Sequence, residues 1–238
     1  MPKLNKVYLL VKEWEKELWV ITLWWGTQPL WTINKLFPNE NLKTTDYFEI
    51  GKMCFIPECN ESNFWSRIMS ELIKYLKQEY KGLLFLYTLA DGIMWKPGYV
   101  YQASNFVYME SFDTLVYLNT KTGEKIHPRT AKSLCQENAL YLGKEKVFWL
   151  TYDFMETKGI QKIQGKMFRY IYPLNKRAKK ILNKYPYWKE KRPKKEDIKW
   201  YLMEQGKKQE IPMPIFNMGI TDWYNKKNIQ QYNQSVLC

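Results

Sequence analysis

Residues 64–89 read FWSRIMSELIKYLKQEYKGLLFLYTL, and this stretch decides the fold of the chain. Its first part has apolar residues three or four positions apart, as on one face of an α-helix: Trp65, Ile68, Met69, Leu72, Ile73 and Leu76. Ser62 or Asn63 can cap this helix, and Gly82 ends it. The apolar run Leu83–Leu89 then predicts a strand that is buried on both faces.

A second predicted strand, Tyr47–Ile56, precedes the helix and is closed by Pro57. The order strand, helix, strand is typical of a βαβ unit, in which a right-handed crossover joins two parallel strands. Further upstream, Val7–Val11 and Leu18–Trp25 predict a β-hairpin, and residues 26–46 are loop-like. We therefore expect an α/β (α+β) fold with a mixed central sheet.

The rest of the chain continues the alternation of helices and strands. The patterns predict a short helix at Tyr99–Phe106, a strand at Val107–Leu118, a hairpin turn at Asn119–Glu124, a helix over 130–143, and a final pair of strands at Val147–Asp153 and Met167–Tyr172. From Asn175 the chain is Lys-rich and helical in tendency, and prolines interrupt it later. We expect residues 1–174 to form the catalytic or scaffold domain and residues 175–238 to form a basic C-terminal extension.

Positive charge is concentrated in that extension. The net charge is +13, yet residues 1–174 carry 22 Lys/Arg against 18 Asp/Glu, whereas residues 175–238 carry 15 against 6. A basic tail on a nearly balanced body indicates a polyanionic partner, nucleic acid first and an acidic membrane surface second. The alternative is a solvated lysine-rich face without a partner.

Aromatic and cysteine content narrow the class of protein further. Eleven Trp and eighteen Tyr can fill a core, and they can also stack on nucleic-acid bases. The four cysteines (Cys54, Cys59, Cys135 and Cys238) have no CxxC spacing, so we expect no metal site. No signal peptide is evident and Leu18–Trp25 is too short to span a bilayer, so we expect no membrane partner and a reducing cytoplasm.

The loop Pro57–Asn63 joins a predicted strand to the start of the predicted helix. Backbone N–H groups at a helix N-terminus attract anions, so this loop is a candidate cofactor site. Its candidate residues are Ile56, Cys59, Asn60, Ser62 and Asn63. Glu58 and Glu61 oppose an anion here, and an ordinary capped helix remains the alternative.

A second candidate site follows the predicted strand Leu83–Leu89. Residues 90–108 read ADGIMWKPGYVYQASNFVY and begin at the carboxyl end of that strand, where open α/β sheets place ligands. Asp91 can serve as a base, and the tyrosines offer hydroxyls and flat faces. The Gln102 and Asn105 amides could pair with the edge of a flipped-out base. The alternative is that these tyrosines pack only as core residues.

Three stretches resemble the Mom-type DNA-modification proteins of bacteriophages. The run from Tyr87 through Tyr108 resembles the family signature, in which an Asp ends a strand and Gly-x-x-Tyr-Gln-Ala-x-Asn-aromatic-x-Tyr follows. The stretch Ile126–Thr130, IHPRT, is similar to the family's His-Pro-Arg element. The stretch Lys166–Leu174 and the basic residues after it resemble a block of Lys, Arg and Tyr in that family. The resemblance covers residues 47–195, and its first block is the most specific.

The resemblance implies a GNAT-like acyltransferase fold that converts adenine in DNA to a carbamoylmethyl-type derivative, which hides phage DNA from host restriction enzymes. Carried over by position, the catalytic candidates are Asp91, Tyr101, Ser104, Asn105 and Tyr108. The DNA-binding candidates are Tyr99, Gln102, Lys166, Arg169, Tyr170, Lys176, Arg177, Lys179 and Lys180. DNA is then the partner, and the host cytoplasm the location if a phage encodes the chain. An acyl-coenzyme A-type donor is a candidate cofactor, although the loop at 56–63 lacks the glycines that GNAT enzymes use.

The chain also departs from the family pattern. The strand and two helices that normally open a GNAT domain have no visible counterpart before Val7. We expect either a shortened chain, a second chain that supplies this layer, or a loss of activity. His127 is the single histidine, and it is either a general base or a structural residue. Two other functions therefore stay open: a non-catalytic nucleic-acid-binding protein on a degenerate GNAT scaffold, and an N-acyltransferase for small molecules or proteins.

Overall fold

The computed structural model describes residues 6–13, 16–55, 63–189 and 191–217, and its contacts divide the chain into two compact units. Unit 1 comprises Met1–Phe112 and Lys166–Ile198, and unit 2 comprises Asp113–Gly165 and Lys199–Cys238. This division differs from the expected boundary at residue 174. Two long strands, β5 (Val107–Asn119) and β7 (Ile160–Pro173), each contribute to both units, so no single cut along the chain separates them.

The predicted hairpin and βαβ unit are confirmed in unit 1. Strands β1 (Lys6–Glu13) and β2 (Lys16–Trp25) pair antiparallel, and β3 (Tyr47–Phe55) continues the sheet antiparallel to β2. Helix α2 (Phe64–Glu79) then leads to β4 (Phe85–Asp91), which pairs parallel with β3. The fold is therefore the mixed α/β arrangement that the sequence predicts.

The apolar stripe of α2 is buried almost as predicted, because Ile68, Met69, Leu72, Ile73 and Leu76 all face the core. Phe64 is buried as well, whereas Trp65 is only half-buried.

The N-cap of α2 differs from the one that the sequence predicts. Asn63 occupies the N-cap position in a left-handed conformation (φ 63°), and its side chain makes no capping hydrogen bond. Ser62, the other cap candidate, lies outside the described residues.

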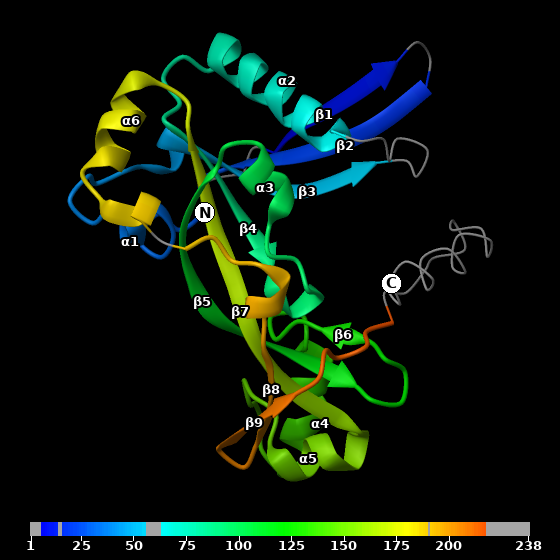
Figure 1. The fold of residues 1–238 in the computed structure, drawn as a ribbon. Coiled ribbons are helices and arrows are strands. Elements are labelled where there is room, and N and C mark those ends of the chain that lie inside the picture. The colour runs from blue at the N-terminus through cyan, green and yellow to red at the C-terminus, as the bar shows by residue number, and fades with distance from the viewer. Residues whose placement is uncertain (1–5, 14–15, 56–62, 190, 218–238) are drawn as a thin grey trace. The chain divides into compact units, whose positions relative to one another are not determined.

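Residues 26–46 are less irregular than expected, because they contain the short helix α1 (Ile33–Leu36). Figure 1 shows α1 beside α6 (Lys176–Asn183), the first helix of the basic extension. Both helices bury apolar residues in one core cluster with Tyr47 of β3 and Tyr87 of β4. The extension therefore begins as part of unit 1 and supplies some of its core.

Strand β7 lies between β4 and β5 in the sheet and runs antiparallel to β4. The predicted strand Met167–Tyr172 is the central part of β7. The predicted strand at Val147–Asp153 is wrong, because residues up to Thr151 form a loop and helix α5 (Tyr152–Lys158) follows. The buried residues of this region, Val147, Leu150 and Phe154, are three and four positions apart, which is a helical spacing and not the alternation of a strand.

Unit 2 is built around a smaller core. Helix α4 (Lys132–Tyr141) and α5 pack with β5 and β7 residues such as Tyr117 and Ile160. Strand β6 (Lys125–Ile126) pairs with β5 through the expected turn.

A hairpin of β8 (Trp200–Glu204) and β9 (Lys207–Ile211) was not predicted, and its β8 pairs with β7. Its turn residues Gln205 and Gly206 both have positive φ, as a two-residue hairpin loop of type I′ requires. In the described part of the chain, no helix has the length and apolar character to cross a bilayer.

Candidate functional site

The motif block 90–108 begins where β4 ends, as predicted. Asp91 is the last residue of β4 and is half-buried. Its Oδ1 accepts a hydrogen bond from the backbone N–H of Ile93 at 3.0 Å, so the carboxylate caps the 3₁₀ turn Gly92–Met94. This contact fixes the orientation of Asp91 at the carboxyl end of a buried strand.

Helix α3 (Tyr99–Ala103) carries the tyrosine part of the motif. Tyr101 is buried, with its ring 5.5 Å from Phe106 and 5.6 Å from Tyr170. The ring of Tyr108 also lies 5.6 Å from that of Tyr170. Burial raises the pKa of the Tyr101 hydroxyl above its usual value. The catalytic candidates Tyr101 and Tyr108 therefore belong to one aromatic cluster around Tyr170.

Gln102 and Tyr170 tie this cluster together. The Gln102 Nε2 donates to the Tyr170 hydroxyl at 2.8 Å, and that hydroxyl donates to the carbonyl of Pro97. Gly98 lies against the Tyr170 ring with φ of 93°, and a Cβ there would come within 2.5 Å of the ring. A glycine is required at this position on both counts. Gln102 and Tyr170, which we expected to contact DNA, are thus engaged with each other.

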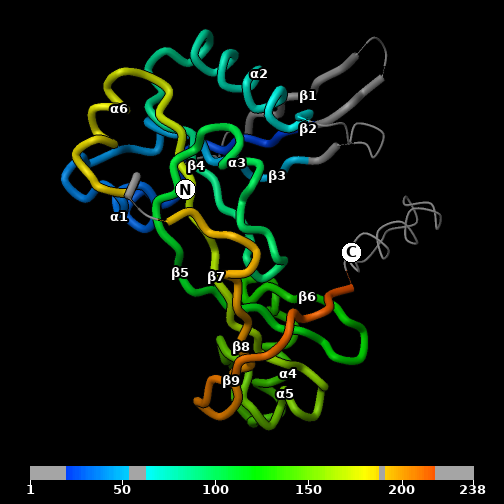
Figure 2. Tube along the Cα trace, in the orientation of Figure 1, coloured from blue at the N-terminus to red at the C-terminus, as the bar shows by residue number. Residues whose placement is uncertain are grey.

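The basic extension returns to the motif block (Figure 2). The Gln102 Nε2 also donates to the carbonyl of Pro193 at 3.0 Å. The backbone N–H of Lys195 donates to the Tyr99 hydroxyl at 3.1 Å, and the Trp95 indole donates to the Lys195 carbonyl at 3.3 Å. The Lys195 ammonium lies 4.1 Å from the centroid of a Trp95 ring. Sequence reasoning missed this contact because partners about a hundred positions apart leave no periodic signal.

The remaining residues of the motif differ in exposure. Tyr99 is 46% exposed, and Asn105 is exposed with a left-handed φ of 60°. Ser104 is buried, and its hydroxyl donates to the carbonyl of Val100 at 2.8 Å. Buried Tyr101 and exposed Asn105 therefore do not share one environment, although both were expected to line a cleft with Asp91.

The other DNA-binding candidates separate into exposed and buried groups. Lys166 is exposed, and so are all four basic candidates on α6: Lys176, Arg177, Lys179 and Lys180. The opposite face of α6 is buried, and Asn175 caps the helix by accepting from the Ala178 N–H at 2.9 Å. The helix is therefore held in place with its cations directed to solvent.

Arg169 is buried, in contrast to these cations. It is 5% exposed and forms an ion pair with Glu110 of β5. Its guanidinium carbon lies 4.1 Å from the ring centroid of Phe112, and its positive charge also acts on the Tyr87 hydroxyl. Burial still raises the pKa of Tyr87 to about 12. The surroundings of Arg169 are those of a structural residue.

Most of the candidate cofactor loop, including Ile56, Cys59, Asn60 and Ser62, lies outside the described residues. Asn63 is exposed, and its side chain makes no capping hydrogen bond to α2. The N-terminus of a helix favours an anion. In the described ranges, no three His, Cys, Asp or Glu side chains gather as a metal would need.

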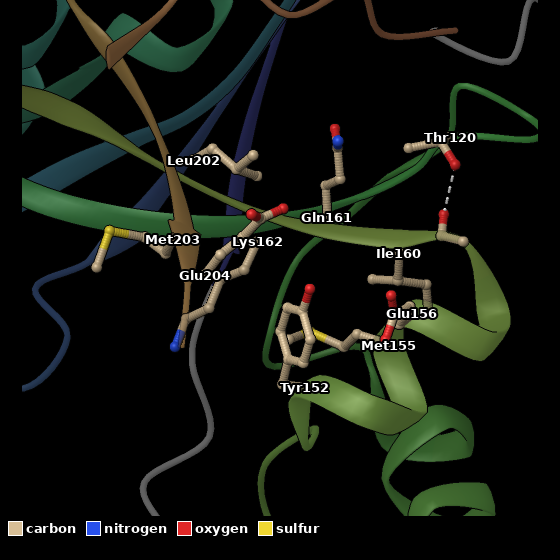
Figure 3. A pocket seen from close by; sticks show the side chains of 11 residues that line it. Thr120, Tyr152, Met155, Glu156, Ile160, Gln161, Lys162, Leu202, Met203 and Glu204 are labelled. Atoms are coloured by element: carbon tan, nitrogen blue, oxygen red, sulfur yellow. Dashed lines mark hydrogen bonds between the residues drawn. The ribbon is translucent and has the colours of Figure 1, made fainter. Parts of the chain in front are cut away.

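Unit 2 contains the His-Pro-Arg element and a pocket of about 210 Å³. His127 is exposed, and its Nδ1 accepts from the Arg129 N–H at 3.1 Å, which leaves Nε2 as the proton-bearing nitrogen of the neutral ring. Figure 3 shows the pocket with Tyr152 and Glu156 from α5 and Glu204 from β8. These two carboxylates raise the pKa of Tyr152, Glu156 having the larger effect. The pocket does not include the His-Pro-Arg element.

Comparison with known proteins agrees with the resemblance seen in the motifs. The methylcarbamoylase Mom of Escherichia phage Mu is 29% identical over 139 residues, which cover 58% of this chain and 52% of that protein. The alignment thus spans about half of that relative's length. A tandem GNAT protein from the clavulanic acid biosynthesis pathway, solved without AcCoA, aligns with 69% of this chain and 55% of its own at 9% identity. The TM-score of that alignment is 0.31. The model of the Mom protein family matches residues 2–194, and this chain therefore belongs to the Mom protein family.

Proposed function

We propose that this chain is a DNA-modifying transferase that converts adenine to a carbamoylmethyl-type derivative. Family membership supports the proposal, and so does the name methylcarbamoylase of the phage Mu relative. The observation that carries it is the contact of the basic segment Pro193–Lys195 with Trp95, Tyr99 and Gln102 of the motif block. Cations that attract phosphates thus lie beside the residues that would receive a base.

Asp91, Tyr99 and Gln102 of the motif block can each be given a role that matches their surroundings. Asp91 would accept the proton that the exocyclic amine of adenine loses, since it is an oriented carboxylate at the end of a strand. Tyr99 is exposed, so its ring can stack on the flipped base. Gln102 and Tyr170 would act as positioning residues that hold α3 against β7.

The DNA backbone would contact the exposed cations. The four cations of α6 lie on the solvent side of an anchored helix, and Lys166 is exposed too. Lys contacts to phosphates position a duplex without reading its sequence. Buried Arg169 has no part in this contact and would instead hold β7 to β5 through Glu110.

The donor would bind where a GNAT-like fold binds it, at the N-terminus of α2. The positive end of the helix dipole there is compatible with the pyrophosphate of an acyl-coenzyme A-type donor. The bound donor would supply the carbon group to the adenine amine: its C–S bond to coenzyme A would break as the C–N bond forms, and the thiol would be the leaving group. In a phage, the adduct would protect the genome from host restriction enzymes.

The test is mass spectrometry of nucleosides from plasmid DNA co-expressed with the chain. A new adenine adduct that requires the chain and is lost in Asp91→Asn supports the proposal. The second candidate, a non-catalytic DNA-binding protein, is favoured by the engagement of the Gln102 amide with Tyr170 and Pro193. DNA that is retained by the protein without any adduct would replace the first function with the second.

A further inference from the structure

Unit 2 has a groove between α4 and the loop that follows it, with a volume of about 560 Å³. Its walls include the motif residues Pro128 and Arg129, the α4 residues Lys132 and Cys135, and the loop residues Lys146 and Phe148. The groove thus contains part of the His-Pro-Arg element, which the proposed reaction does not use.

The loop that forms one wall of the groove is held by hydrogen bonds to α4. Asn138 of α4 is fully buried, and its Nδ2 donates to the Trp149 carbonyl at 2.9 Å. The Thr151 hydroxyl donates to the Asn138 Oδ1 at 2.8 Å. Val147 and Leu150 are buried, so the loop is held by its side chains as well as by its backbone.

This anchored loop exposes two large aromatic side chains. Phe148 is 76% exposed and Trp149 is 57% exposed. A fixed loop that leaves such apolar area in water is typical of a binding surface and not of a core. Because the backbone is held by Asn138, the loop that carries both rings has little backbone freedom to lose on binding.

The charge of the groove is positive. Arg129, Lys132 and Lys146 line it against one carboxylate, Glu145. All three cations are exposed, and the Lys146 ammonium lies 4.8 Å from the centroid of the Phe148 ring. The backbone N–H of Arg129 donates a hydrogen bond to Nδ1 of His127, which fixes the backbone where the groove begins. Cations next to an exposed aromatic face suit a ligand that is both anionic and flat.

We propose that this groove binds a single DNA strand, with phosphates against Arg129, Lys132 and Lys146 and one unstacked base on Phe148. A nucleotide uses both features of the groove, whereas an acidic peptide or an anionic membrane surface uses only its charge. The identity of the strand as DNA rests on the proposed function. The groove thereby adds a nucleic-acid contact within unit 2, separate from the motif block and α6 in unit 1.

The test measures binding of a fluorescein-labelled oligothymidylate to the full chain by anisotropy over a series of salt concentrations. The groove variant is Arg129→Gln/Lys132→Gln/Lys146→Gln. The matched control is Lys121→Gln/Lys207→Gln/Lys208→Gln, which removes equal charge from exposed positions of unit 2 outside the groove. The groove variant should flatten log Kd against log[salt] by about two units, at roughly 0.7 per phosphate contact. The control should keep the wild-type slope.

A second variant separates stacking from charge. Phe148→Ala should weaken binding about tenfold at unchanged salt slope, because it removes a stacking face and no charge. Circular dichroism checks that each variant is folded. Equal slopes for the groove variant and its control, or no loss of affinity in Phe148→Ala, would overturn the proposal. Polyglutamate that displaces the oligonucleotide at equal charge, together with unchanged Phe148→Ala affinity, would assign the groove to acidic peptides.

The binding assay and the adduct assay distinguish a failure of the groove proposal from a failure of the proposed function. The binding assay needs no chemistry, so groove-dependent binding with no adenine adduct leaves the groove proposal standing and removes the reaction. An adduct made by wild type, with oligonucleotide binding unaffected in both groove variants, leaves the reaction standing and removes the groove. A wild-type chain that does not bind the oligonucleotide removes the groove proposal.

Discussion

The side-chain amide of Gln102 donates a hydrogen bond of 2.8 Å to the hydroxyl of Tyr170, which joins α3 to the middle of the sheet. Tyr170 is fully buried, and its hydroxyl also donates to Pro97. The motif residues of α3 therefore depend on a strand 68 positions further along the chain.

Tyr170→Phe should lower the free energy of unfolding by about 1–3 kcal/mol, because buried polar partners lose their hydrogen bonds. Urea unfolding of the wild type and the variant measures this difference. Tyr99→Phe is the control: its exposed hydroxyl accepts one bond from Lys195, so a smaller loss is expected. Equal losses in the two variants would contradict a special role for the Gln102–Tyr170 pair.

Stability should fall at alkaline pH. Burial raises the pKa of Tyr87 and of Tyr170 to about 12, above the usual value of 10.0. Because the folded chain holds these protons more tightly than the unfolded chain, their contribution is complete below about pH 10 and is lost between about pH 10 and pH 12. Each group contributes on the order of 3 kcal/mol, at about 1.4 kcal/mol for each pKa unit. Urea midpoints measured from about pH 9 upward should decline in the wild type and decline less in Tyr170→Phe. An identical decline in both would show that Tyr170 is not among the groups responsible.

Substitution of Arg169 should lower the free energy of unfolding and leave the salt dependence of DNA binding unchanged. Arg169→Met leaves the partly exposed Glu110 without its cation, which should cost about 1–3 kcal/mol, while Arg169→Met/Glu110→Met should cost less than the single change. Urea unfolding and a salt titration of duplex binding measure the two effects. A flatter salt slope in the folded Arg169→Met protein would instead make Arg169 a phosphate contact.

Asp91→Asn and Tyr101→Phe should each abolish adenine modification while fold and DNA binding stay nearly intact. Both changes conserve volume, and the amide oxygen of Asn can still accept from the Ile93 N–H. The measurements are adduct yield by mass spectrometry and duplex affinity by anisotropy. Wild-type adduct yield in both variants would remove the two residues from the mechanism.

The exposed face of α6 should dominate the salt dependence of duplex binding. Replacing Lys176, Arg177, Lys179 and Lys180 with Gln should flatten log K against log[salt] by up to about three or four units, one for each lost phosphate contact. The buried face of α6 is unchanged, so the fold should persist. A control with Lys35, Lys52, Lys74 and Lys81 replaced by Gln removes equal charge from exposed positions of unit 1. If both quadruple variants show one slope, the cations of α6 are only a solvated face.

The sequence by itself determined the βαβ unit, the first hairpin and the concentration of cations in the C-terminal extension. Each follows from a local pattern. Apolar residues three or four positions apart form the buried side of a helix, and a continuous apolar run forms a central strand. The motif Gly98–Tyr108 likewise indicated the family before any contact was visible. Local patterns failed at Val147–Asp153, where buried residues at helical spacing were interpreted as a strand.

Only the tertiary structure decided which motif residues touch each other and which face solvent. The contact of Lys195 with Trp95 and Tyr99 depends on where the extension passes after α6. The burial of Arg169 depends on the order β4, β7, β5 in the sheet, which places Glu110 beside it. Such pairs join positions 59 to 100 residues apart. Hydrogen bonds between near neighbours fix a helix or a turn, but a contact across that separation forms only when the whole sheet is assembled.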